Sequence, residues 1–147
     1  MNYSSSIVQL GNTACGGKNP ILIQSMTTTK TMDTERTVAQ VRELVLAGCD
    51  FVRITTRNSK EAENLKNIKH ELQKAGVEVP LIADVHFNPR VAETAAQFVE
   101  KVRINPGNYI DKEREGKAYQ EYDDNDVLER ITKQLRPLIK RCKQFPT

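Results

Sequence analysis

Short apolar runs recur along this chain, and each is followed by a segment whose apolar side chains have helical spacing. The runs begin at residues 21, 51, 80 and 101, so successive starts lie 30, 29 and 21 residues apart. We expect these runs to form strands over 21–24, 51–55, 80–85 and 101–104. Strands and helices that alternate at this spacing are typical of βαβ units, in which right-handed crossovers join parallel strands. The sequence therefore predicts an α/β fold built on a parallel sheet.

End signals place the first two helices. Asp33 or Thr34 can cap the start of the first helix, and Gly48 can end it. Ser59 can cap the second helix, which Gly76 closes. The apolar stripe expected on the second helix consists of Ala62, Leu65, Ile68 and Leu72. Each predicted helix thus fits between two predicted strands.

Two more helices are predicted further along the chain. Asn88 is suited to cap the third helix, because Pro89 then takes the first helical position. Residues 111–126 hold seven acidic and three basic side chains with little apolar content, so we expect a solvated acidic loop over 109–126. A long helix should start near Asp126. Its expected apolar stripe consists of Val127, Ile131, Leu135, Leu138 and Cys142.

Composition narrows the class of protein. The chain has 147 residues, of which 38% are hydrophobic, which is enough to build a core and argues against disorder. The 22 Lys and Arg residues exceed the 19 Asp and Glu residues by only 3, which argues against a nucleic-acid-binding domain. No apolar run approaches the roughly 18 residues of a membrane span, and residues 1–12 lack the features of a signal peptide. We therefore expect a cytoplasmic protein without membrane or nucleic-acid partners.

The three cysteines do not indicate a metal site. Cys15, Cys49 and Cys142 lie at spacings that match no zinc or iron–sulfur pattern. Free thiols are the ordinary state of cysteines in the reducing cytosol. We expect no metal ligands within this chain.

Polar side chains gather at the carboxyl ends of the predicted strands. Arg53 belongs to the second strand, Asp84 and His86 end the third, and the fourth carries Arg103 and then Asn105. Parallel strands that are buried on both faces are expected to be apolar, so these residues are unusual there. The carboxyl ends of parallel strands form the ligand site of α/β proteins. The sequence therefore predicts a ligand site at this edge of the sheet.

The side chains at this edge favour the binding of an anion. Two convergent arginines, Arg53 and Arg103, can each bind phosphate with two hydrogen bonds, which suits a diphosphate. His86 can donate to a phosphate oxygen or transfer a proton, and Asp84 can orient it or hold a substrate hydroxyl, so both are catalytic candidates. Alternatively, the two arginines form buried ion pairs with Asp84 and a neighbouring carboxylate.

Four segments carry a resemblance to a known family. PILIQSMTTTKTMD, CDFVRITT, PLIADVHFNPRVA and VRINPGN, in this order over roughly residues 7–108, closely resemble the N-terminal half of the 4-hydroxy-3-methylbut-2-enyl diphosphate synthases. The resemblance implies a TIM-type (β/α)8 barrel that binds 2-C-methyl-D-erythritol 2,4-cyclodiphosphate at its carboxyl-end rim. It also implies a separate C-terminal domain with a 4Fe–4S cluster, and reductive ring opening with electrons from ferredoxin or flavodoxin.

The same resemblance assigns roles to individual residues and to the chain as a whole. Thr27 matches a family residue near the substrate. The substrate-binding residues that it implies are Met26, Arg53, Asp84, His86, Arg103 and Asn105. We expect residues 1–147 to form about four βα units, the first half of the barrel, with the iron–sulfur domain and its cluster ligands outside this chain. Such a chain should be inactive alone and should form homo-oligomers through its open sheet edges.

Two other functions remain open at this point. One is a different phosphate- or pterin-binding barrel, for which dihydropteroate synthase is the nearest architecture. The other is a non-enzymatic assembly module that is complete at this length.

Overall fold

A four-stranded parallel sheet lies at the centre of the protein. The computed structural model describes residues 5–86, 88–105 and 124–145. The strands, in their order across the sheet, are β3 (Gln24–Met26), β4 (Phe51–Thr55), β5 (Leu81–Val85) and β6 (Lys101–Ile104). All three neighbouring pairs are parallel, so the predicted α/β fold with a parallel sheet is confirmed.

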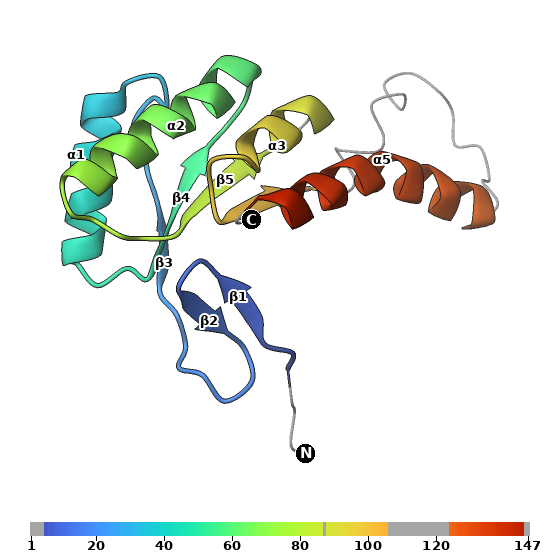
Figure 1. Cartoon of the computed structure of the whole chain (residues 1–147), viewed down its shortest axis with the longest axis horizontal. Coiled ribbons are helices and arrows are strands. Elements are labelled where there is room, and N and C mark those ends of the chain that lie inside the picture. Colours follow the sequence, from blue (N-terminus) through green and yellow to red (C-terminus); the bar gives the residue numbers. More distant parts are fainter. Residues whose placement is uncertain (1–4, 87, 106–123, 146–147) are drawn as a thin grey trace.

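Helices cover one face of this sheet, as Figure 1 shows. They are α1 (Thr34–Leu46), α2 (Ser59–Lys74), α3 (Pro89–Ala95) and α5 (Asp124–Gln144). In the described part of the chain, a helix follows each of β3, β4 and β5, and α5 comes after β6; the division into about four βα units stays a prediction. A feature that the periodicity did not predict precedes them, an antiparallel hairpin of β1 (Val8–Leu10) and β2 (Thr13–Cys15).

The helix starts follow the expected chemistry with one correction. The side chain of Asp33 accepts a hydrogen bond from the Arg36 N–H at 3.1 Å and caps α1. The cap of α2 is Asn58 and not Ser59 as predicted, because Asn58 has extended backbone and its Oδ1 accepts from the Glu61 N–H at 3.0 Å. Asn88 caps α3 in the predicted manner, and Pro89 is the first helical residue.

The first predicted strand is displaced by three residues. We expected residues 21–24, but the hydrogen-bonded ladder with β4 begins at Gln24. The Asp50 carboxylate accepts the Ile23 N–H at 2.7 Å, in the place where a strand carbonyl would otherwise bond. Ile21 and Ile23 are also strongly exposed, which contradicts the expected burial of this run.

The main hydrophobic core lies between the sheet and the helices. Successive residues of a strand point to opposite faces. In β4, Val52 and Ile54 are fully buried on the helix side, whereas Arg53 and Thr55 belong to the opposite face. The helix-side residues of the next strand are Leu81, Ala83 and Val85. The pleat thus separates an apolar face from a face that carries charge.

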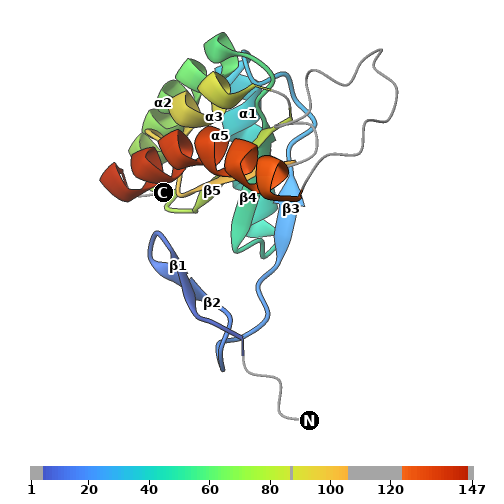
Figure 2. The ribbon, with the colours of Figure 1, turned by 90° about the vertical axis from the view of Figure 1, so that its right-hand side faces the viewer.

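The hairpin covers the amino-terminal half of the opposite face. Leu10 of β1 packs against Phe51 of β4 and Ile82 of β5, and Leu22 packs at the side of this second small cluster. Figure 2 shows the hairpin apart from the helices. The carboxyl-terminal half of the same face, one to two residues further along each strand, is not part of this apolar cluster.

The last helix confirms part of the predicted stripe, since Val127 and Ile131 are half-buried and are not among the residues packed against the main core. Leu138 is buried, and Leu135 and Cys142 pack against the main core, while the helix contacts α3. Burial raises the pKa of the Cys142 thiol. Residues 109–123 of the predicted acidic loop lie outside the described residues. Residues 124–126 belong to α5, so the loop prediction was wrong for these three. Among the helices that the structure describes, none is both long and apolar enough to cross a membrane.

Candidate anion-binding site

Four strands bring the predicted site residues to one face. Met26 of β3 is the register partner of Arg53, and Asp84 of β5 is the register partner of Arg103 in β6. Residues paired in register project from the same face of a sheet. His86 follows the last residue of β5 at the same edge. The side chains predicted from separate strand ends therefore meet on the face away from the helices.

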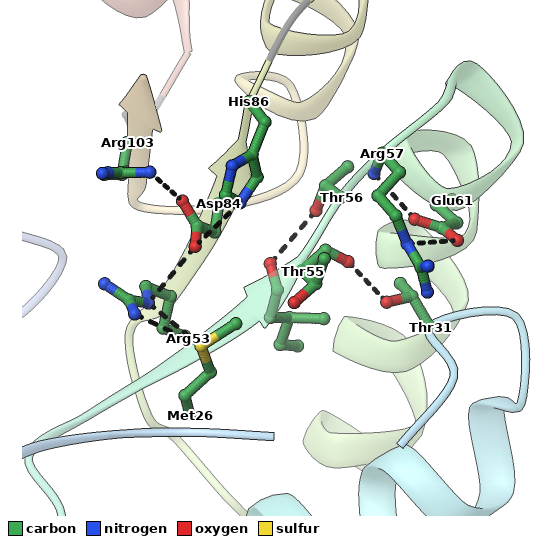
Figure 3. A network of polar contacts seen from close by, with 11 residues as sticks. Met26, Thr31, Arg53, Thr55, Thr56, Arg57, Glu61, Asp84, His86 and Arg103 are labelled. Atoms are coloured by element: carbon green, nitrogen blue, oxygen red, sulfur yellow. Dashed lines mark hydrogen bonds and ion pairs between the residues drawn. The ribbon is translucent and has the colours of Figure 1, made fainter. Parts of the chain in front are cut away.

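Asp84 is the centre of these contacts, as Figure 3 shows. Its Oδ1 accepts a hydrogen bond from Arg103 Nη1 at 3.0 Å. Its Oδ2 lies 3.5 Å from Arg53 Nε and 3.5 Å from His86 Nε2. We call Met26, Arg53, Asp84, His86 and Arg103 the Asp84 cluster.

Burial differs sharply within the Asp84 cluster. The Asp84 side chain is 3% exposed, whereas those of Arg53 and Arg103 are 31% and 40% exposed. A buried carboxylate needs charged or hydrogen-bonding partners, and the two guanidinium groups supply them. The ion pairs that the sequence left as an alternative are therefore present. Two cations share one anion, however, so a positive charge remains in excess and both arginines still reach solvent.

Met26 contacts an arginine. Arg53 Nε and Nη2 donate to Met26 Sδ at 3.4 and 3.2 Å. Sulfur is a weak acceptor, so these contacts orient the guanidinium without occupying all of its five N–H donors. An anion in front of the sheet can take the remaining donors.

A carboxylate that the sequence analysis missed organises the chain after β4. Glu61 is buried on α2, and its Oε2 accepts a hydrogen bond from the Arg57 N–H at 2.7 Å. Its Oε1 lies 3.6 Å from Arg57 Nε, and the Arg57 side chain remains largely exposed (Figure 3). The signal for this role was available, because Glu61 lies four residues before Leu65, one turn along the apolar stripe of α2. A charged residue there needs a partner nearby.

The other two predicted residues at this edge behave differently. Asn105 follows β6 and is half-buried, and within the described residues it takes no part in the contacts that join the Asp84 cluster. Thr27 donates its N–H to the Arg53 carbonyl at 2.9 Å. Its hydroxyl is buried and has no hydrogen-bond partner in the described part of the chain. Leaving a buried hydroxyl unpaired is costly.

The cysteines are dispersed over the fold. Cys15 is exposed on the hairpin, Cys49 lies between α1 and β4, and Cys142 is on α5. Across residues 5–86, 88–105 and 124–145, no group of three or more His, Cys, Asp or Glu residues could hold a metal ion. These residues therefore do not fit a 4Fe–4S cluster.

Sequence comparison supplies a family match and close relatives. A family model described as the GcpE TIM-barrel domain matches residues 5–144. A 4-hydroxy-3-methylbut-2-en-1-yl diphosphate synthase (flavodoxin) of Phocaeicola vulgatus is 51% identical over 154 residues, covering 99% of this chain and 25% of the relative. A protein of the same name from Leptospira interrogans is 49% identical, covering 94% of this chain and 21% of the relative. The chain thus spans about a quarter of the length of the curated relatives that it matches.

A solved structure supports the fold. The dihydropteroate synthase of Burkholderia cenocepacia, determined with 7,8-dihydropteroate, superposes with a TM-score of 0.55 over 95% of this chain and 60% of that chain. The sequence identity is 16%, so this likeness concerns architecture alone. The sequence predicted an architecture like that of dihydropteroate synthase, and this similarity of fold is confirmed. The similarity gives no information about the ligand of this chain.

Proposed function

The chain belongs to the GcpE TIM-barrel family, and on that basis we propose that it is the substrate-binding part of a 4-hydroxy-3-methylbut-2-enyl diphosphate synthase. The proposed substrate is 2-C-methyl-D-erythritol 2,4-cyclodiphosphate. The proposed reaction of the whole protein is its reductive conversion to 4-hydroxy-3-methylbut-2-enyl diphosphate in isoprenoid biosynthesis. The names of the relatives support this activity.

The observation that carries the proposal is the pair of half-exposed arginines on one buried carboxylate. Arg53 and Arg103 belong to different strands, yet both are aligned by Asp84. Alignment in advance reduces the entropy that a ligand must remove when it binds. An arginine fork forms parallel hydrogen bonds with phosphate oxygens. A diphosphate offers a phosphate group to each of the two forks, which a ligand with a single phosphate does not.

The remaining site residues have supporting roles in this proposal. His86 lies next to Asp84, at the edge from which a ligand approaches, and it can donate a proton to a ligand oxygen. Asp84 holds both the imidazole and the guanidinium groups in place. Asn105 is proposed to contact the substrate from the end of β6. Met26 is proposed to contact the substrate from the end of β3.

Redox chemistry is assigned to parts of the protein other than the described residues. Flavodoxin appears in the names of the relatives, and we propose it as the electron donor. The 4Fe–4S cluster expected for the family is proposed to have its ligands outside this chain. We therefore propose that this chain binds the cyclic diphosphate and does not turn it over.

Calorimetric titration of the 147-residue chain with the cyclic diphosphate and with inorganic pyrophosphate tests the proposal. We expect both to bind, and we expect Arg53→Ala and Arg103→Ala each to weaken binding about 10- to 100-fold, because each removes charged hydrogen bonds. Arg42→Ala, which removes an exposed arginine of α1, is the matched control and should leave the affinity unchanged.

The outcomes separate the rival functions. Unchanged affinity in both site variants would place the anion elsewhere and overturn the proposal. Tight binding of 7,8-dihydropterin with no binding of pyrophosphate would favour a pterin-binding barrel. Light scattering on the same samples tests the proposed self-association through the outer strands β3 and β6, and a strict monomer at high concentration would contradict it.

A further inference from the structure

The loop between β3 and α1, residues 27–33, is held by an unusually dense polar network. Thr31 and Thr37 are fully buried, and so is most of Asn64, although all three are polar. Thr29 Oγ1 and Thr37 Oγ1 lie 2.8 Å apart. Buried polar networks of this kind fix one conformation when every member is paired. This loop follows Met26 directly, so its position bears on the Asp84 cluster.

Gln40 of α1 makes three hydrogen bonds to the loop. Its Oε1 accepts from the Thr28 N–H at 2.8 Å and from the Thr29 N–H at 3.2 Å. Its Nε2 donates to Thr28 Oγ1 at 2.9 Å. The whole side-chain amide is therefore engaged by two successive loop residues. Within the described residues, no other side chain accepts hydrogen bonds from two backbone N–H groups of the loop.

The far side of the loop is fixed to α2 and β4. Asn64 Nδ2 donates to the Thr31 carbonyl at 2.8 Å. Thr31 Oγ1 in turn donates to the Thr55 carbonyl at 2.5 Å, at the carboxyl end of β4 (Figure 3). The loop is thus attached to β4 two residues beyond Arg53.

The near side of the loop is attached to β4 at Arg53 itself. The Thr27 N–H bonds to the Arg53 carbonyl, and Met26 Sδ accepts from the Arg53 guanidinium. Gln40 forms hydrogen bonds with Thr28 and Thr29, the two residues that follow Thr27. A shift of the loop at Thr28 is therefore transmitted through Thr27 and Met26 to both the backbone and the side chain of Arg53.

We propose that Gln40 is a positioning residue for anion binding, which holds the β3–α1 loop so that Met26 and Thr27 keep Arg53 aligned with Asp84. Gln40 touches neither the Asp84 cluster nor the expected ligand position, and it acts through the loop. The inference rests on the proposed function for its ligand, inorganic pyrophosphate being the probe. The orientation of Arg53 can be measured without any ligand.

The test compares three variants of the 147-residue chain. Gln40→Met keeps the length and helix propensity of the side chain and removes all three hydrogen bonds. Gln40→Glu keeps an acceptor oxygen for the Thr28 and Thr29 N–H groups. Gln73→Met, at an exposed glutamine of α2, is the control. Each is titrated with pyrophosphate at 0.15 M salt, where an added surface charge is largely screened.

Two readouts are recorded for each variant. We expect Gln40→Met to bind pyrophosphate about 3- to 10-fold more weakly, since the loss of a set of hydrogen bonds changes affinity by that order. The affinities of Gln40→Glu and of the control should stay within about twofold of that of the parent chain. The second readout is the Arg53 Nε–H resonance in ¹H–¹⁵N spectra, identified by its loss in Arg53→Lys. It should shift in Gln40→Met and return in Gln40→Glu.

The two readouts keep this inference distinct from the proposed function. If the parent chain does not bind pyrophosphate, the proposed function fails, while the Arg53 resonance still reports on Gln40. An unshifted Arg53 resonance in Gln40→Met would overturn the inference. Pyrophosphate binding that is equal in the parent chain and in Gln40→Met would overturn it as well.

Discussion

The two faces of the same four-stranded sheet are built from alternate residues and have opposite character. On the helix side, Val52 and Ile54 are completely buried in the main core. On the other side, Arg53 lies between them in sequence, yet it contacts Asp84 and remains partly exposed. One pleated strand therefore supplies both the stability of the fold and the charge of the site. Single substitutions should therefore change the stability and the anion affinity separately.

The largest expected effect is on stability, from the helix side. Ile54→Ala should lower the free energy of unfolding by about 2–5 kcal/mol, because it removes a fully buried side chain and leaves a cavity. Pyrophosphate affinity should change less than about twofold while the chain stays folded, since neighbouring side chains of a strand face opposite ways. Urea unfolding and calorimetry measure the two quantities.

A matched substitution sharpens this result. Ile23→Ala removes the same atoms at a position that is 58% exposed, and it should cost no more than about 0.5 kcal/mol. If Ile54→Ala weakened pyrophosphate binding as strongly as it weakened folding, the two faces would not be independent.

The second effect concerns the charged face, where Asp84 would compete with a bound anion for the arginines. Asp84→Asn keeps an acceptor oxygen that can align Arg103 and removes the buried negative charge, so pyrophosphate affinity should rise about 3- to 10-fold at low salt and the gain should shrink at high salt. Stability should fall by about 1–3 kcal/mol, because the two guanidinium groups lose the negative partner that compensates their charge. Titration at two salt concentrations and urea unfolding measure both changes.

Asp50→Asn is the control for this change of charge. Asp50 precedes β4 at the amino end of the sheet, and the substitution keeps an acceptor for the Ile23 N–H. Its effect on pyrophosphate affinity should be small. Asp84 has two opposed effects on anion binding, since it aligns the arginines and it repels the anion. Weaker binding in Asp84→Asn would mean that the alignment is the larger effect.

The smallest expected effect concerns Met26. Met26→Leu keeps a similar volume and removes the sulfur acceptor of Arg53, so pyrophosphate binding should weaken about twofold, as expected for a weak contact. Met32→Leu makes the same exchange at an exposed methionine and should have no effect. Equal affinities in all three proteins would reduce Met26 to a packing residue.

The local pattern of the sequence was enough to predict most of the fold. The strands over 51–55 and 101–104 are confirmed residue for residue, and 80–85 differs by one residue. The stripe of α2 is confirmed as well, because helical spacing reports directly which side chains face a sheet. The parallel order also followed from the pattern, since a helix between two strands returns the chain to the same end.

The displaced first strand shows where local pattern fails. Ile21 and Ile23 have the composition of a buried strand, but both are strongly exposed and the ladder with β4 begins only at Gln24. Whether an apolar side chain is buried depends on what packs against it, and the alternation of residue types does not contain that information. The hairpin was missed for a different reason, because its two three-residue strands are too short to show a period.

The sequence predicted which residues belong to the candidate site better than it predicted the contacts between them. Charged residues at strand ends identified Arg53, Asp84 and Arg103, because buried strands seldom carry charge there. Their common partner depends on the register between strands, which brings Asp84 opposite Arg103. Gln40 could not be identified in this way, since a glutamine on a helix surface has no distinguishing pattern until the loop beside it is known.

The small apolar cluster of Leu10, Phe51 and Ile82 has a consequence for the depth of a ligand. Phe51 and Ile82 each lie two residues before a charged member of the site on the same face, a distance of about 7 Å along a strand. A hydrated phosphate group gains nothing by moving onto hydrocarbon, so a diphosphate bound as proposed would be held at the level of the arginines. The hairpin, whose Leu10 completes this apolar cluster, would then limit how far such a ligand reaches toward the amino end of the sheet.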